Sequence, residues 1–246
     1  MTEAWFLAPV AALICGVLAL APLGHQVLAR GVVFIDLAVA QAAAAAALWA
    51  GALMDHPGWI STQTLAAAGA LACAAAVAWL SKKWPAEREA RIGLLYVMGA
   101  SAALLGARLD PHGRERLGEL LAADVLWAGW PQVAVLAGCA LAVALVGRRL
   151  TRDAVFYPVF ALVASLAVPT LGLFVVFAAL IAPALWQRSG SHRVAAWTAG
   201  VLACGVGLGV SWWLDAPSGA CVALALSVMG AASILRRRPQ PGPAGL

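Results

Sequence analysis

The chain has 246 residues, of which 63% are hydrophobic and only 11% are charged, and its formal net charge is +5. A soluble domain of this size cannot hide so much apolar surface, so the composition predicts an all-α, polytopic helical membrane protein; the short alternating segments of a β-barrel are absent. The positive charge is small and lies in loops, which excludes nucleic-acid binding and points to orientation in the bilayer instead.

The first predicted span runs from Trp5 to Ala21. It is preceded by Met1-Thr2-Glu3, which contains no Lys or Arg. A cleaved signal peptide needs a basic start, so we expect this span to be retained. A short turn is expected at residues 22–31, carrying His25 and Arg30.

The second predicted span, residues 31–54, is the most unusual one because it contains Asp36, Gln41 and the alanine run 42–47. It exceeds the roughly 20 apolar residues that cross a bilayer. An aspartate near the middle of a span costs roughly 2.5–3.5 kcal/mol on insertion scales and usually faces a bundle interior or a pathway. The alanines make the helix thin, so neighbouring helices can approach closely. We therefore predict an internal helix.

Both polar residues of this span also have a purely structural interpretation. Asp36 then pairs with a partner such as Arg30, near the helix start. Gln41 then hydrogen-bonds to a neighbouring helix.

Further single spans are expected at residues 61–80, 91–107, 131–147, 194–214 and 217–235. Residues 114–126 look amphipathic, and we expect a short helix there at the membrane surface. The chain is predicted to form one transmembrane domain over residues 1–235, followed by a disordered cytoplasmic tail over residues 236–246.

Residues 154–187 are too long for one ordinary span and short for two. Pro169, Gly172 and Pro183 interrupt them. Two short crossings and a re-entrant hairpin both fit; we favour two crossings, which gives nine spans. The three residues either kink helices or, since broken helices often line substrate sites, line the pathway.

Lys and Arg residues in short loops predict the orientation. Four basic stretches are expected in the cytoplasm: Lys82 to Arg91, Arg148 to Arg152, Arg188 to Arg193 and Arg236 to Arg238. The turns at 55–60 and 215–216 contain acids but no Lys or Arg and are expected outside, as is the N-terminus.

Four stretches resemble the membrane subunit of zinc/manganese-type ABC transporters, the metal-uptake permeases. They follow one another along nearly the whole chain: Pro22 to Gly31 with Phe34-Ile35-Asp36, Glu119 to Trp127, Gly172 to Ala184, and Leu214 to Ala220.

The resemblance implies a multi-pass permease of the cell inner membrane. It implies that the chain works as a homodimer or pseudo-dimer and forms the pathway for a divalent zinc, manganese or iron ion, which is a transported substrate and not a tightly bound cofactor. Its implied partners are a cytoplasmic ATP-binding subunit, an external metal-binding protein, a second permease copy and membrane lipid.

The residues agree that the chain is not itself the ATPase, because it contains no Gly-x-x-x-x-Gly-Lys-Ser/Thr phosphate-binding loop. Arg148, Arg149 and Arg152 are expected to contact the ATPase subunit, although their loop is short compared with the coupling segment usual in the family.

The chain also departs from the family at the expected metal site. The family often carries an aspartate and, four residues later, a histidine on one face of the second span. Here Ala40 follows Asp36 at that distance, and Gln41 lies about 140° around the helix from Asp36. Asp36 is thus the candidate metal ligand and His25 a weaker one. Carboxylate and amide oxygens suit hard ions better than zinc.

Two other classes of protein also fit a polytopic helical chain. One is a secondary carrier for ions or small solutes, and the other is a membrane assembly factor that transports nothing. Full transport without ATP would favour the carrier.

Overall fold

The computed structural model describes residues 6–54, 58–109, 112–121 and 123–236. They form ten α-helices and four short 3-10 helices, with no strand among the described residues. The α-helices are α1 (Leu7–Arg30), α2 (Ile35–Leu53), α3 (Trp59–Lys83), α4 (Arg88–Leu109), α5 (Gly113–Leu121), α6 (Trp130–Val146), α7 (Asp153–Leu171), α8 (Leu173–Arg188), α9 (Arg193–Leu214) and α10 (Ser218–Ala232). The 3-10 helices are η1 (Pro85–Glu87), η2 (Val125–Trp127), η3 (Gly147–Thr151) and η4 (Ser233–Arg236).

The predicted all-α membrane bundle is confirmed. Eight of the described α-helices, namely all except α5 and α8, are long and apolar enough to cross a membrane, when α4, α6 and α10 are taken together with their adjoining 3-10 helices. The expected tail begins at Arg236, and its residues 237–246 lie outside the described part of the chain.

Helix α1 is longer than predicted. A turn was expected to begin at Pro22, but the helix continues through this proline and ends at Gly31, which adopts the left-handed conformation with φ 62°. The residues around the proline are buried, and Gly24 lies so close to α8 that a Cβ on it would be 1.8 Å from the carbonyl oxygen of Leu180. The free energy gained by this packing outweighs the loss of the backbone hydrogen bond that a proline removes from a helix interior.

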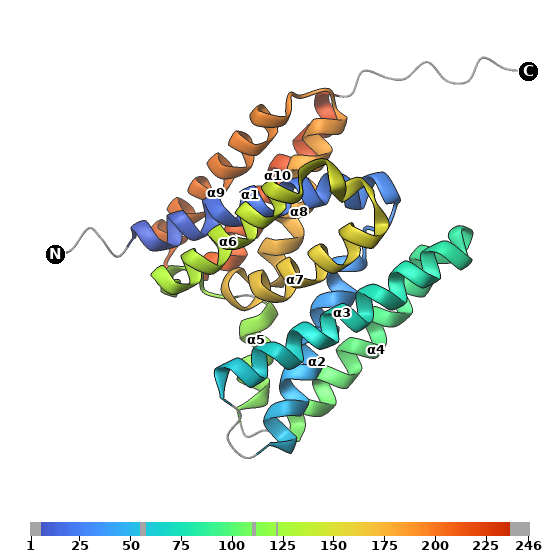
Figure 1. The fold of residues 1–246 in the computed structure, drawn as a ribbon. Coiled ribbons are helices and arrows are strands. Elements are labelled where there is room, and N and C mark those ends of the chain that lie inside the picture. Colours follow the sequence, from blue (N-terminus) through green and yellow to red (C-terminus); the bar gives the residue numbers. More distant parts are fainter. Residues whose placement is uncertain (1–5, 55–57, 110–111, 122, 237–246) are drawn as a thin grey trace, which may run out of the picture.

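Helix α2 is the thin internal helix that its alanines predict. A Cβ on Gly69 of α3 would lie 2.7 Å from the Ala42 carbonyl oxygen, and a Cβ on Gly99 of α4 would lie 3.2 Å from the Gln41 Cβ. Trp49 Nε1 also donates a 2.9 Å hydrogen bond to the Ala102 carbonyl oxygen of α4. Helices α2, α3 and α4 therefore form one tightly packed group, seen in the lower part of Figure 1.

The remaining long helices pack around α1. Helix α1 lies against α6 and α8, and α9 pairs with α10 (Figure 1). A Cβ on Gly207 of α9 would lie 2.5 Å from the Val222 Cα of α10, so this pair is also in backbone contact. Fully buried Phe156 and Phe160 of α7 fill the centre, where α7 also contacts α2 and α3. One continuous hydrophobic core thus joins the two groups.

The interrupted segment 154–187 forms two helices, which agrees both with the two crossings that we favour and with a re-entrant hairpin. They are separated by Gly172 alone, whose φ of 78° is a conformation that side-chain-bearing residues rarely adopt. Pro169 and Pro183 lie inside α7 and α8 and end neither helix. Helix α8 has 16 residues, which corresponds to about 24 Å, so its full crossing stays a prediction.

The predicted amphipathic helix 114–126 is shorter than expected. Helix α5 ends at Leu121, and Val125 belongs to η2. Leu117 and Leu120 of α5 pack against a small core formed by α2 and α4. The apolar face of α5 thus contacts protein, and its location at the membrane surface stays a prediction.

Several segments with basic residues meet at one end of the bundle. We call this the basic end and define it as residues 26–33, 82–91, 147–153 and 188. Arg30 contacts η3 and the start of α7, Glu89 accepts a hydrogen bond from the Val33 amide, and Arg188 donates to the Leu28 carbonyl. Segments that were predicted on one side of the membrane are therefore in mutual contact.

Candidate functional site

Asp36 is the most unusual ionisable group among the described residues. Its side chain is only 1% exposed, and neither carboxylate oxygen has a hydrogen-bond partner in the described part of the chain. An unpaired buried carboxylate is costly, so a proton or a cation is required to neutralise it.

The sequence predicted Asp36 near the middle of its span, but the structure places it elsewhere. Helix α2 begins only at Ile35, because α1 extends to Arg30 and the turn between them occupies residues 31–34. Asp36 is therefore in the first turn, next to the basic end. The helix N-terminus carries unpaired N–H groups and the positive end of the helix dipole, which favour a negative charge there.

Arg30 is not the partner of Asp36. Its Nε instead lies 2.9 Å from Asp153 Oδ1, in an ion pair between the end of α1 and the start of α7. The structural interpretation in which Arg30 neutralises Asp36 is therefore wrong. The two charges are close in sequence, but the turn at 31–34 separates their side chains.

Gln41 and Asp36 lie on different faces of α2. Ala40 and Ala43 follow Asp36 on its own face, since residues three, four and seven positions apart share a helix face. Gln41 is 6% exposed and packs against Gly99 of α4. Its position fits a residue at a helix–helix contact, and the structure does not bring it to the Asp36 carboxylate.

Among the described residues, no group of three or more His, Cys, Asp or Glu side chains is arranged to hold a metal ion. His25 is exposed on α1, whereas Asp36 is buried on α2. His25 thus lies on a helix and not in the predicted turn.

The three helix-breaking residues lie in different surroundings. Gly172 is buried at the junction of α7 and α8, and Pro169 is exposed. Pro183 is buried against α9, where a Cβ on Gly200 would lie 3.3 Å from its ring.

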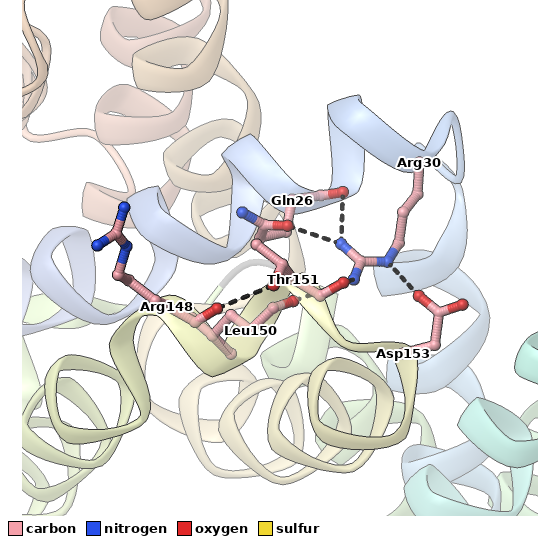
Figure 2. Close-up of polar contacts among 6 residues, drawn as sticks. All are labelled: Gln26, Arg30, Arg148, Leu150, Thr151 and Asp153. Carbon is pink, nitrogen blue, oxygen red and sulfur yellow. Dashed lines mark hydrogen bonds and ion pairs between the residues drawn. The ribbon is translucent and has the colours of Figure 1, made fainter.

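Arg30 forms the densest polar cluster at the basic end, and Figure 2 shows its contacts. Besides the ion pair with Asp153, Nη1 donates to the Gln26 side-chain oxygen at 2.8 Å and to the Gln26 carbonyl at 3.3 Å. Nη2 donates to the carbonyls of Leu150 and Thr151 at 3.0 and 2.9 Å. Arg30 therefore ties the end of α1 to η3 and to the start of α7.

The segment held by Arg30 carries the three arginines that the sequence assigned to the ATPase contact. Arg148, Arg149 and Arg152 are all exposed, whereas Leu150 between them is buried. The side chain of Arg148 extends away from the cluster in Figure 2. The backbone of this segment is thus fixed from inside while its charges face outward.

A second polar contact joins two of the family-like stretches. The Ser218 hydroxyl, at the start of α10, donates to Asp124 Oδ1, just before η2. The carboxylate also accepts from the Leu126 amide at 3.2 Å. The stretch from Glu119 to Trp127 is thereby anchored to the stretch from Leu214 to Ala220.

Comparison with known proteins gives a family for this architecture. A family model described as the ABC 3 transport family matches residues 148–237. The chain is therefore similar to this family over its C-terminal part. The matched region contains the stretches from Gly172 to Ala184 and from Leu214 to Ala220, so the resemblance to this family is confirmed. This similarity and the eight apolar helices support a multi-pass membrane permease of an ABC transporter, in which a separate subunit hydrolyses ATP.

A solved structure has a similar fold. A chain of "PsaBC from Streptococcus pneumoniae in complex with Fab" matches with a TM-score of 0.72 and 16% sequence identity, covering 92% of this chain and 89% of that chain. The likeness at this identity concerns the fold. No curated protein matches the sequence.

The sequence missed the role of Arg30 in this permease. An arginine at the end of an apolar span is an ordinary sign of orientation. Its partners Leu150, Thr151 and Asp153 lie at least 120 positions further along the chain, and no local signal connects them.

Proposed function

We propose that the chain forms the membrane pathway for a divalent metal ion, with zinc, manganese or iron as the transported substrate. ATP hydrolysis in a cytoplasmic subunit drives the transport, an external metal-binding protein delivers the ion, and a second copy of the chain completes the permease. The match of residues 148–237 to the ABC 3 transport family supports the ATP-driven permease, and the resemblance of the four stretches to metal-uptake permeases supports the ion.

The observation that carries the proposal is the unpartnered carboxylate of Asp36. A carboxylate held in an apolar bundle without a counter-charge attracts a cation whenever the pathway opens to it. Its oxygen atoms suit hard divalent ions. A single carboxylate binds an ion weakly, which allows the ion to leave.

Further residues are assigned to the pathway and to the partner contact as part of the same proposal. The junction at Gly172, together with Pro169, Pro183 and Gln41, shapes the helices around the pathway. The exposed Arg148, Arg149 and Arg152 bind the ATPase subunit. His25 stays a weak candidate for a metal ligand.

The test of this proposal is the Asp36→Asn variant, which keeps the shape of the side chain and removes its charge. We expect normal amounts of inserted, assembled protein, and uptake of the transported metal at least tenfold lower per assembled complex. Uptake of zinc, manganese and iron is measured separately, so that the same experiment also identifies the ion.

Glu89→Gln is the matched control. Glu89 is a second acid, within the basic end. Its Oε2 is buried without a hydrogen-bond partner, but unlike Asp36 its carboxylate is held by one hydrogen bond: Oε1 accepts from the Val33 amide at 2.8 Å. A glutamine oxygen can also accept this bond. Uptake in this control should stay within about twofold of the unmodified protein. Normal uptake of every metal by assembled Asp36→Asn would refute the pathway role and make Asp36 a buried structural acid.

A further inference from the structure

We propose that Arg30 is a positioning residue that couples the ATPase-binding segment, residues 147–153, to the helix that carries Asp36. This inference rests on the proposed function, because it needs an ATPase subunit at residues 147–153 and a pathway at Asp36. It goes beyond that function by assigning the mechanical link between them to one side chain.

The first argument is the number and direction of the hydrogen bonds. A guanidinium has five N–H donors in a rigid plane. Arg30 makes five hydrogen bonds, which are shared among α1, η3 and α7. Two of them go to the consecutive carbonyls of Leu150 and Thr151. Movement of this backbone therefore breaks these bonds or moves the end of α1 with it.

The second argument is the packing of the guanidinium. The Arg30 side chain is only 14% exposed. Its Cζ lies 4.2 Å from the centroid of the Phe156 ring, and Phe156 is completely buried in α7. A planar cation stacked on a fixed ring has little freedom to reorient, so displacement of η3 is passed on and is not absorbed by a flexible side chain.

The third argument is the short, constrained path from Arg30 to Asp36. The next residue, Gly31, has φ 62° and lies against Arg88, whose Nη2 would be 2.6 Å from a Cβ at this position. The Val33 amide is held by Glu89. Just before Arg30, the Leu28 carbonyl accepts a 2.6 Å hydrogen bond from Arg188. The end of α1 and the turn thus move together with the start of α2.

The experiment uses the complete transporter, with the permease and its ATP-binding subunit reconstituted in liposomes. ATP hydrolysis and metal uptake are measured in the same sample, and their ratio is the readout. Arg30→Lys keeps the charge but loses the planar, five-donor geometry. We expect an assembled complex that still hydrolyses ATP but transports at least tenfold less metal per ATP.

Arg91→Lys is the matched control. Arg91 also lies near the basic end and stacks on an aromatic ring, but its ion pair is with Glu87 one helical turn away, at 2.7 Å. The metal transported per ATP should remain within about twofold of the unmodified protein in this control.

Asp153→Asn and the double variant Arg30→Lys with Asp153→Asn provide an independent check. If both side chains belong to one link, the double variant should lower the ratio no further than Arg30→Lys alone. An unchanged ratio in Arg30→Lys overturns the inference. Failure of both single variants to assemble also overturns the inference, because Arg30 would then be needed for folding and not for coupling. Failure of the proposed function itself looks different, because the unmodified complex would then transport no metal.

Discussion

At the scale of single residues, two ionisable groups at neighbouring helix ends differ in how many hydrogen bonds they form. The Arg30 guanidinium uses its full set of donors within the protein. The Asp36 carboxylate is more deeply buried but has no hydrogen-bond partner among the described residues. A saturated group stabilises one arrangement, whereas an unsatisfied one is free to take up a cation. This contrast agrees with the two roles we propose, coupling for Arg30 and metal passage for Asp36.

Close backbone contacts depend on individual glycines. Gly24 of α1 faces the Leu180 carbonyl of α8 with no room for a side chain. Small residues at such crossings let helices in a membrane approach and gain van der Waals contact.

Gly24→Ala should therefore destabilise the protein by about 1–3 kcal/mol, because the added methyl group forces α1 away from α8. The measurement is the midpoint of thermal unfolding in detergent, which should fall. Gly138→Ala in α6 is the control, since a Cβ there meets nothing within 4 Å. Its midpoint should stay the same or rise, because alanine favours a helix more than glycine does. Equal effects of the two substitutions would contradict the close packing of α1 and α8.

At the scale of elements, η3 with Arg152 has the features expected of the docking segment that we propose. Leu150 anchors it, and the Thr151 hydroxyl donates to the Arg148 carbonyl at 2.9 Å, which stabilises the turn. Its arginine side chains remain exposed. The segment therefore combines an ordered backbone with exposed positive charges. Both features suit a contact with an acidic or polar groove.

Reversing the charge of this segment with Arg149→Glu and Arg152→Glu should weaken assembly with the ATPase subunit. We expect the amount that co-purifies in detergent to fall at least tenfold. Arg108→Glu, an exposed residue near the opposite end of α4, is the control and should leave co-purification unchanged. Full recovery of the complex with the doubly reversed segment would place the ATPase contact elsewhere.

At the scale of the whole molecule, the contacts at the basic end agree with the orientation that Lys and Arg residues predict. The ends of α1 and α3 and the starts of α2, α4 and α7 lie on this side, where Lys82 and Asp153 also line one groove. The Asp124–Ser218 contact lies beside the turn at 215–216, which was predicted outside.

Reporter fusions should therefore give a cytoplasmic signal after Lys83, Arg149 and Arg238, and an external one at His56. The reason is the excess of Lys and Arg in cytoplasmic loops. His56 and Arg238 lie outside the described residues, so this experiment also tests the chain beyond them. An external signal at Arg149 would contradict both the topology and the proposed ATPase contact.

The sequence by itself determined the class of protein and the positions of most helices, and it predicts their orientation. These properties depend on local composition: an apolar run of sufficient length forms a helix in a membrane, and Lys or Arg at its end marks a side. The resemblance of ordered stretches also led to the family. Even the break within 154–187 was visible, because Gly172 is the residue type that its backbone conformation requires.

Only the tertiary structure decided what the local rules leave open. Pro22 does not end α1 because the residues around it are packed against other helices. Asp36 lies at the start of α2. It forms no ion pair with Arg30, because the Arg30 guanidinium is bonded to η3 and α7 instead. Each of these outcomes depends on segments that are far apart in the chain and meet only on folding, and their packing and hydrogen bonds outweigh the preferences of the nearby sequence.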